Sequence, residues 1–279
     1  MNNTEFAFIS LSDLVYIPSD SVYIPFPDIS DWPKDSAFKF LLPSETRKDF
    51  LKKASISENE KVWIFDYKSN NIWSAPVKSL ALVAVLNPYD NWEEGGFEVG
   101  DYMIGFQLDL SKFPVQNFDL INSLATINKV NIFMSKGLSM VSWIPGKAVD
   151  FANQNSTLPS FWRSEIQKNA YFTATYNEFQ IDVHTMTKQS NQAYHYTIRN
   201  KVTGELMDDF LVQSSESCEP APLNLVDPNF STGNQWIGSL IKGQPPVLLG
   251  LEYYSFSCPK IHVLKKGIQP WILNCDCRH

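Results

Sequence analysis

The sequence contains four histidines, and histidine is the side chain that exchanges protons most readily near neutral pH. Two of them, His184 and His195, lie on either side of a predicted turn at residues 188–191. A hairpin that places Ile181 opposite Ile198 keeps one face apolar and sets the two histidines directly opposite each other. Opposed side chains have Cβ atoms roughly 4.5–5.5 Å apart, which is close enough for two imidazoles to share a metal ion.

Carboxylates on the same strands extend this histidine pair into a candidate metal site. The register that opposes the histidines also places Asp182 opposite Thr197. Asp209 falls beside His195 if Gly204 forms a bulge, and turns to the other face if it does not. A divalent metal ion would then find two imidazoles and two carboxylates, from Asp182, His184, His195 and Asp209. The favoured interpretation is nevertheless a solvent-facing histidine pair, because a one-residue slip in register would separate these groups.

A second group of metal-ligating residue types is concentrated near the C-terminus. Zinc prefers thiolate and imidazole ligands, and the candidates here are Cys258, His262, Cys275, Cys277 and His279. A single residue separates Cys275 from Cys277, whereas zinc knuckles typically place two residues between their cysteines. On a strand, both sulfurs would continue an apolar face. Cysteines packed in the core are therefore favoured over zinc ligands, and also over a nucleophile pair made of Cys258 and His262.

An acidic and aromatic segment at residues 91–98 joins two predicted strands. Its candidate binding residues are Trp92, Glu93, Glu94 and Glu98. Paired carboxylates beside aromatic rings can bind sugars or perform acid–base chemistry on them. A solvated loop is the simpler interpretation, and the same residues would also suit a basic protein partner.

Motifs and charge exclude several common classes of protein. The sequence contains no Walker loop, G-x-G-x-x-G, H-E-x-x-H or G-x-S-x-G pattern. The net charge of −7 argues against a nucleic-acid partner, which normally requires a basic surface. The longest apolar run, Leu80–Leu86, is too short to cross a bilayer, so no membrane partner is expected. The N-terminus lacks the features of a signal peptide, which predicts a cytoplasmic location with reduced cysteines.

The histidine pair requires a sheet to hold it, and residues 171–213 show the clearest strand pattern in the sequence. Three strands of a meander are predicted, at 171–186, 193–200 and 205–213. Other strands are predicted at 62–68, 72–77, Leu80–Leu86, 101–110, 130–134, 138–144, 247–251, 253–258, 261–264 and 271–277. Helices are predicted at 44–54, 117–128 and after Pro159. The first helix would have Ser44 as its N-cap and Arg47 on its solvated face.

These elements predict an α+β fold in which sheet is dominant, mostly antiparallel, with a few short helices. The chain, 1–279, is expected to form one domain. If it forms two lobes, the boundary is expected near 145–160, where proline, glycine and polar residues are concentrated.

Function is less constrained than fold, because unrelated functions share folds. The missing catalytic motifs favour a non-catalytic protein that binds another macromolecule, as inhibitors and immunity proteins do. The first alternative is an enzyme that uses a divalent metal held by the histidine and aspartate cluster of residues 171–213. The second alternative is a carrier with an aromatic-lined cavity for a small ligand.

Overall fold

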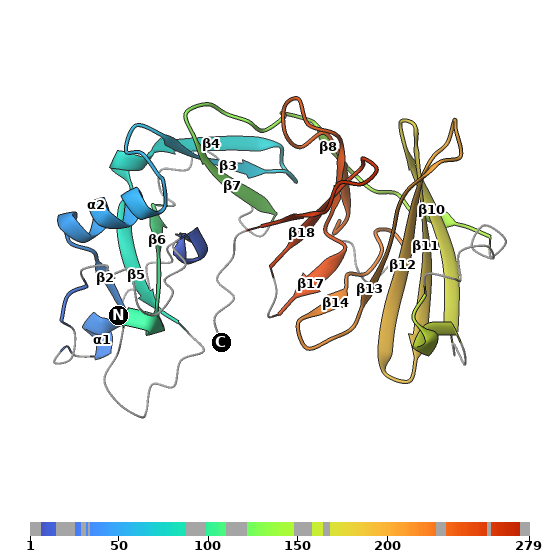
Figure 1. Cartoon of the computed structure of the whole chain (residues 1–279), viewed down its shortest axis with the longest axis horizontal. Helices are drawn as coiled ribbons and strands as arrows, with labels where there is room; N and C mark the ends of the chain where they lie inside the picture. The colour runs from blue at the N-terminus through green and yellow to red at the C-terminus, as the bar shows by residue number, and fades with distance from the viewer. Residues whose placement is uncertain are drawn as a thin grey trace. The chain divides into compact units, whose positions relative to one another are not determined.

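Figure 1 shows the computed structural model of the whole chain. The structure describes residues 7–14, 26–28, 32, 34–87, 99–109, 122–147, 158–163, 168–226, 233–255 and 258–273. The chain divides into two compact units, with the division between Ser135 and Lys136. Most of the segment 145–160, where a boundary between lobes is expected from the sequence, lies outside the described residues.

The structure confirms the predicted sheet-dominant α+β class, since several antiparallel sheets are accompanied by few and short helices. Among the described residues, the helix α2 (Ser44–Lys53) is the one helix of seven or more residues. The other helices are α1 (Lys34–Ala37), η1 (Ser12–Leu14), η2 (Val77–Ser79), η3 (Val99–Asp101) and η6 (Ser160–Arg163). In the described part of the chain, no helix has the length and apolar character needed to cross a membrane.

The first unit contains a four-stranded sheet in the order β1-β6-β5-β2. These strands are β1 (Ala7–Ser10), β2 (Lys39–Leu41), β5 (Ala81–Leu86) and β6 (Tyr102–Leu108). The prediction of a strand buried on both faces at 80–86 is confirmed, because β5 is interior and five of its six residues are buried. Phe50 and Leu51 of α2 are buried in the same apolar core.

A three-stranded sheet in the order β4-β3-β7 completes the first unit. Its strands are β3 (Lys61–Asp66), β4 (Asn71–Pro76) and β7 (Ser123–Asn128). The predicted hairpin at 62–77 is confirmed, but the predicted helix at 117–128 is wrong for residues 123–128. Leu124 and Ile127 have helical spacing, yet β3 offers this segment a complete antiparallel ladder, and Ile127 packs on the core from that ladder. Residues 117–121 lie outside the described residues.

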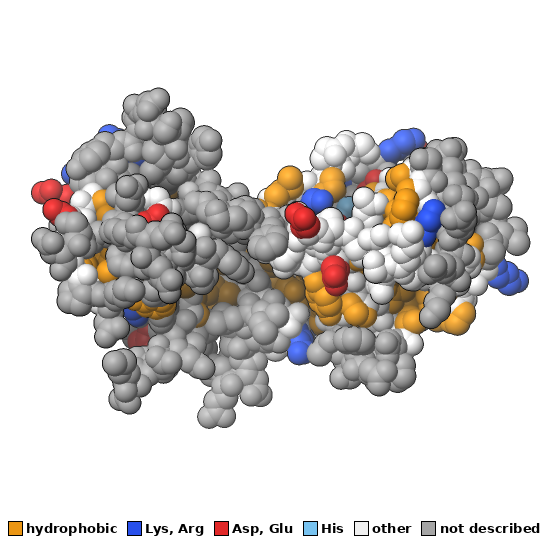
Figure 2. All heavy atoms as spheres, turned by 90° about the horizontal axis from the view of Figure 1, so that it is seen from below, with side chains coloured by type: hydrophobic (Ala, Val, Ile, Leu, Met, Phe, Trp, Pro, Cys, Tyr) orange, Lys and Arg blue, Asp and Glu red, His pale blue; other side chains and the backbone are white. Residues whose placement is uncertain are grey.

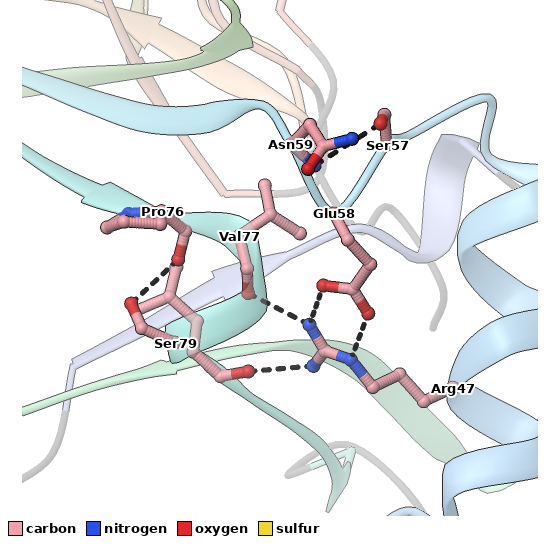
Figure 3. A network of polar contacts seen from close by, with 8 residues as sticks. Arg47, Ser57, Glu58, Asn59, Pro76, Val77 and Ser79 are labelled. Carbon is pink, nitrogen blue, oxygen red and sulfur yellow. Dashed lines mark hydrogen bonds and ion pairs between the residues drawn. The ribbon is translucent and has the colours of Figure 1, made fainter.

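Arg47 does not lie on a solvated face of α2, as its position in the sequence suggests. Its guanidinium donates to both carboxylate oxygens of Glu58, at 2.7 and 2.8 Å (Figure 3). It also donates to the carbonyl oxygens of Val77 and Leu80, at 2.8 and 2.7 Å. One side chain therefore ties α2 to the segment before β3 and to both ends of η2. The predicted N-cap is also wrong, because Ser44 is the first residue of the helix and no side chain caps it.

We expect Arg47→Ala to lower the free energy of unfolding by roughly 2–4 kcal/mol, because two carbonyl groups and a carboxylate lose a charged donor. Arg47→Lys should restore less than half of this loss, since an ammonium group cannot reproduce the forked geometry of guanidinium. Lys48→Ala is the matched control on the same helix, and its cost should stay below about 0.5 kcal/mol. Chemical denaturation measures all three variants, and equal costs for Arg47→Ala and Lys48→Ala would contradict the structural role of Arg47.

The contact with Arg47 also has a pH dependence. The hydrogen bond from Arg47, followed by its positive charge, lowers the pKa of Glu58 below 4.5, although burial acts in the opposite direction. The folded state therefore favours the ionised form of Glu58. The contribution of the Arg47–Glu58 contact to the free energy of unfolding is fully present above about pH 4.5. It is lost as the pH falls through the lowered pKa.

The described residues of the second unit form two five-stranded sheets and one two-stranded sheet. The first has the order β13-β12-β11-β10-β9, with strands β9 (Ile144–Pro145), β10 (Lys168–Tyr176), β11 (Phe179–Lys188), β12 (Asn191–Asn200) and β13 (Leu206–Gln213). The second has the order β19-β18-β16-β15-β8, with strands β8 (Leu138–Met140), β15 (Trp236–Gly238), β16 (Val247–Leu249), β18 (Lys260–Val263) and β19 (Trp271–Ile272). The small sheet pairs β14 (Cys218–Pro220) with β17 (Glu252–Tyr254).

The predicted meander is present, but with four long strands instead of three. The expected strand at 171–186 is two strands, β10 and β11, because the chain turns at Asn177 with a φ of 48°. Asparagine tolerates this left-handed conformation better than most residues. One face of the meander packs against the second sheet in a shared apolar core, to which Val183 and Tyr196 contribute from the meander and Leu248 from β16.

Candidate functional site

The predicted register of the β11–β12 hairpin is confirmed. His184 lies directly opposite His195, Asp182 opposite Thr197, and Ile181 opposite Ile198. Asp209 reaches His195, which is the outcome expected if the strand pair contains a bulge, but the bulge lies between Ile198 and Arg199 and not at Gly204.

The histidines are not solvent-facing, although the sequence favours that interpretation. His184 is 5% exposed and His195 is 2% exposed, on the face of the meander opposite the shared core. The ring of Tyr171 stacks on His184 with centroids 4.3 Å apart. Farther along the same face, Trp162 of η6 packs in a separate apolar cluster with Leu158, Met186, Ala193 and Leu211. Trp162 also donates its indole N–H to Gln213 Oε1 at 3.0 Å, which fixes η6 over this face.

The two carboxylates of the predicted metal site make separate polar contacts. His195 Nε2 lies 2.5 Å from Asp209 Oδ1. Asp182 instead receives hydrogen bonds from Arg199 at 3.1 Å and from Gln180 at 2.9 and 3.0 Å. Within the described residues, no three His, Cys, Asp or Glu side chains form a group that could hold a metal ion. Metal binding by Asp182, His184, His195 and Asp209 stays a prediction.

The surroundings of His184 change its proton affinity. Burial, and next the neighbouring His195, lower the pKa of His184 to about 4. Its imidazole is therefore neutral at physiological pH, and it contributes an apolar ring against Tyr171 and no charge. The arrangement suits packing within the sheet better than proton exchange with a bulky substrate, because both histidines are almost inaccessible to solvent.

The cysteine and histidine residues near the C-terminus are only partly described. Cys258 is disulfide-bonded and Cys218 is a free thiol. A disulfide sulfur carries no thiolate, so in this state Cys258 can act neither as a zinc ligand nor as a nucleophile. His262 is buried on β18, where its ring stacks on Phe210 at 3.8 Å and its Nδ1 lies 3.8 Å from Asp208 Oδ2.

Cys275, Cys277 and His279 lie outside the described residues. The acidic and aromatic segment does as well, with its candidate residues Trp92, Glu93, Glu94 and Glu98.

A buried pair of amides that sequence patterns did not reveal organises a different part of the second unit. Asn224 is 1% exposed and Gln235 is 0% exposed. The Asn224 side-chain amide donates to the carbonyl oxygens of Val141 and Gln235, at 2.9 and 2.7 Å. Its Oδ1 accepts from the backbone N–H groups of Asn234 and Gln235, at 2.6 and 3.1 Å. Asn224 therefore uses its two amide protons and both acceptor positions in backbone contacts.

Gln235 completes the network from the opposite side. Its Oε1 accepts from the backbone N–H of Asn224 at 2.8 Å and from the indole N–H of Trp143 at 3.3 Å. Its amide donates to the carbonyl oxygens of Pro222 and Gly250, at 2.9 and 3.3 Å. Gly250 has a φ of 77°, and a Cβ there would collide with the carbonyl oxygen of Asn234. The two amides thus hold four chain segments together, which are residues 221–224, the residues just before β15, the segment after β8 and the segment after β16.

This network holds in place a loop that exposes apolar side chains. Leu225 directly follows Asn224, has a φ of 61° and is 64% exposed. Val226 next to it is 37% exposed. A left-handed conformation is unfavourable for a branched residue by roughly 1–2 kcal/mol, and such outliers often occur where proteins clamp ligands. The structure therefore keeps an apolar side chain in solvent on a strained backbone.

Two further exposed residues belong to the same part of the unit. Tyr253 is exposed, and its hydroxyl donates to Asn234 Oδ1 at 3.1 Å. Met140 is exposed, lies opposite Trp236 in the β8–β15 ladder, and has its Sδ close to Gly233. We define the 225 surface as the exposed residues Met140, Leu225, Val226 and Tyr253. Figure 2 shows hydrophobic side chains reaching the surface of the second unit in several places.

The sequence gives little indication of this site. Residues 214–231 read as a polar loop with prolines, because neither an alternating nor a helical apolar pattern is present. Asn224 and Gln235 are eleven residues apart and carry no motif. Only the leucine and valine that follow Asn224, set within a polar segment, distinguish this loop.

The 225 surface can bury apolar area against another molecule. Comparison of this chain with protein-family models, with curated proteins and with solved structures finds no significant match.

Proposed function

We propose that the protein is a non-catalytic binding protein that docks onto another macromolecule through the 225 surface. The observation that carries this proposal is the exposed Leu225 at positive φ, held by the buried network of Asn224 and Gln235. Isolated exposed apolar residues are common and need no explanation. Leu225 differs from them because the fold accepts backbone strain where a glycine or asparagine would remove it.

The energetics of this loop suit binding. Complete burial of a leucine side chain contributes roughly 1.5–3 kcal/mol, which corresponds to a factor of about 10–100 in affinity. Asn224, next to Leu225, is already held by buried hydrogen bonds, so little of this gain is lost to ordering the backbone at Leu225. Binding would therefore bury the Leu225 side chain, which folding leaves exposed to solvent.

Leu225→Gly separates a binding role from a structural one. Glycine adopts positive φ without strain, so we expect the free energy of unfolding to stay unchanged or to rise by up to about 1 kcal/mol. Partner binding should fall by about tenfold or more in the same variant. A clear loss of stability would instead show that Leu225 is a structural residue.

A photo-crosslinking residue at position 225 identifies the partner in an extract of the native cells. The control places the same residue at Val202, which is 84% exposed in the β12–β13 turn of the same unit. We expect a discrete product from position 225 that is missing from position 202. That product should also disappear when wild-type protein is added as competitor. Identical products from both positions would refute docking through the 225 surface.

The cellular location is a separate proposal. The cytoplasmic location expected from the sequence stays a prediction, and the disulfide at Cys258 argues against it, because such bonds are rare in reducing compartments. Peptide mapping without reduction, performed on protein from native cells, would show whether Cys258 is oxidised there.

A further inference from the structure

The chain segments that form and border the 225 surface carry an uneven distribution of charge. These segments are residues 138–141, 214–226, 233–237 and 250–255. They contain three carboxylates, those of Glu216, Glu219 and Glu252, and no lysine or arginine. Glu216 and Glu219 are exposed, whereas one carboxylate oxygen of Glu252 is fully buried.

The two exposed carboxylates occupy defined positions. Glu219 lies directly opposite Tyr253 in the β14–β17 ladder, so the two side chains share one face of this small sheet. The backbone of Glu216 accepts a hydrogen bond from Ser255 Oγ at 2.6 Å. Lys260 also approaches, since its backbone N–H donates to the hydroxyl of Tyr254 at 2.9 Å. The exposed charges on and beside the β14–β17 pair are therefore two carboxylates, Glu216 and Glu219, and one lysine, Lys260, which leaves an excess of negative charge.

This charge distribution favours one kind of partner. Complementary charges at the edge of an interface accelerate association and exclude partners of the same sign. Nucleic acids and anionic membranes would bring negative charge toward Glu219. A symmetric pair of identical chains would bring two copies of the same acidic edge together, because a twofold interface uses the same surface twice. A cationic protein partner would bring positive charge to Glu219 and would be attracted instead of repelled.

We infer that the 225 surface binds a protein segment that presents apolar side chains flanked by lysine or arginine. This inference rests on the proposed function and adds the chemistry of the partner. The apolar side chains would bury Leu225 and Tyr253, and the basic residues would pair with Glu219 and Glu216 at the edge.

Fluorescence anisotropy with three labelled 18-residue peptides tests the inference. The first is an amphipathic helix of leucine and lysine, the second replaces lysine by glutamate, and the third is a scrambled leucine–lysine sequence of the same composition. We expect the first peptide alone to bind, with an affinity that falls steeply between low and physiological salt.

Variants of the full chain locate the binding. Leu225→Gly should weaken the leucine–lysine peptide about tenfold, and Glu219→Gln about threefold at low salt. The matched controls are Val202→Ser and Glu178→Gln, two exposed positions elsewhere in the same unit, which should change affinity less than twofold. Thermal melting checks that each variant is folded.

The outcomes separate this inference from the proposed function. If the leucine–glutamate peptide binds equally well and Leu225→Gly weakens both, the surface is a docking site without preference for cations, and the inference is wrong. If Glu219→Gln and Glu178→Gln change the affinity for the leucine–lysine peptide equally, the inference of a cationic partner is also wrong. If Leu225→Gly changes neither peptide, the proposed function fails together with it. Self-association of the chain that Leu225→Gly abolishes would replace the cationic partner with a second copy.

Discussion

Asn224→Ala is expected to lower the free energy of unfolding of the second unit by roughly 3–5 kcal/mol. The substitution leaves two backbone N–H groups and two carbonyl groups without their side-chain partner in a buried environment. Each buried polar group that loses its partner costs about 1–3 kcal/mol. The total stays below the sum because water can enter part of the space that is vacated.

A matched asparagine in the same unit provides the control for this prediction. Asn200 Oδ1 also accepts from two backbone N–H groups, those of Val202 and Thr203, but it does so in an exposed turn. Asn200→Ala should therefore cost only about 1 kcal/mol, since water replaces the lost acceptor. Hydrogen–deuterium exchange of β15 and β16 measures the loss locally, without contribution from the first unit. Equal exchange rates in the two variants would show that the Asn224 network is not a stability determinant.

Acidification is expected to destabilise the second unit through His184, by roughly 3 kcal/mol between pH 6.5 and pH 4. Burial, and then His195, lower the pKa of His184 from 6.5 to about 4, so the folded state binds this proton less tightly than the unfolded chain. The sign follows from this difference. The stabilisation of the folded state that depends on neutral His184 is fully present above pH 6.5 and declines as the pH falls. Below about pH 4 the loss of this stabilisation is complete and does not grow further.

His184→Phe isolates this effect from the titration of carboxylates. Phenylalanine keeps an aromatic ring against Tyr171 but has no proton to bind. Chemical denaturation of wild type and variant at several pH values gives a stability difference in which groups common to both cancel. This difference should shift in favour of the variant as the pH falls from 6.5 to 4. A difference that is constant over this range would contradict the lowered pKa.

Local sequence patterns determined the parts of this fold in which neighbouring strands meet through short turns. The register of β11 and β12 follows from the alternation of Ile181 and Val183 with polar residues, and from a turn that leaves one apolar pairing available. The buried strand β5 follows from an uninterrupted apolar run. The paired residues of β11 and β12 lie close together in the chain, so the pattern and the structure contain the same information. The partners of β5 are more distant, but its apolar run predicts burial whichever strands flank it.

Patterns failed where the decisive partner is distant in sequence. Residues 123–128 became a strand because β3, about 60 residues earlier, supplies their hydrogen-bond partners. Arg47 became a structural residue because Val77 and Leu80 direct their carbonyl oxygens toward it. Neither the spacing of residues 123–128 nor the residue type at position 47 indicates which distant segment supplies the hydrogen-bond partner.

The histidine pair shows both sides of this division. The sequence by itself determined that His184 and His195 are opposed, because pairing of a two-residue hairpin depends only on local alternation. The tertiary structure decided that they are buried, since solvent access depends on what covers the sheet. It also decided that Asn224 and Gln235 form a network with Leu225 exposed beside it. Amides carry no periodic pattern, and their role arises only when four separate segments bring their backbone groups together.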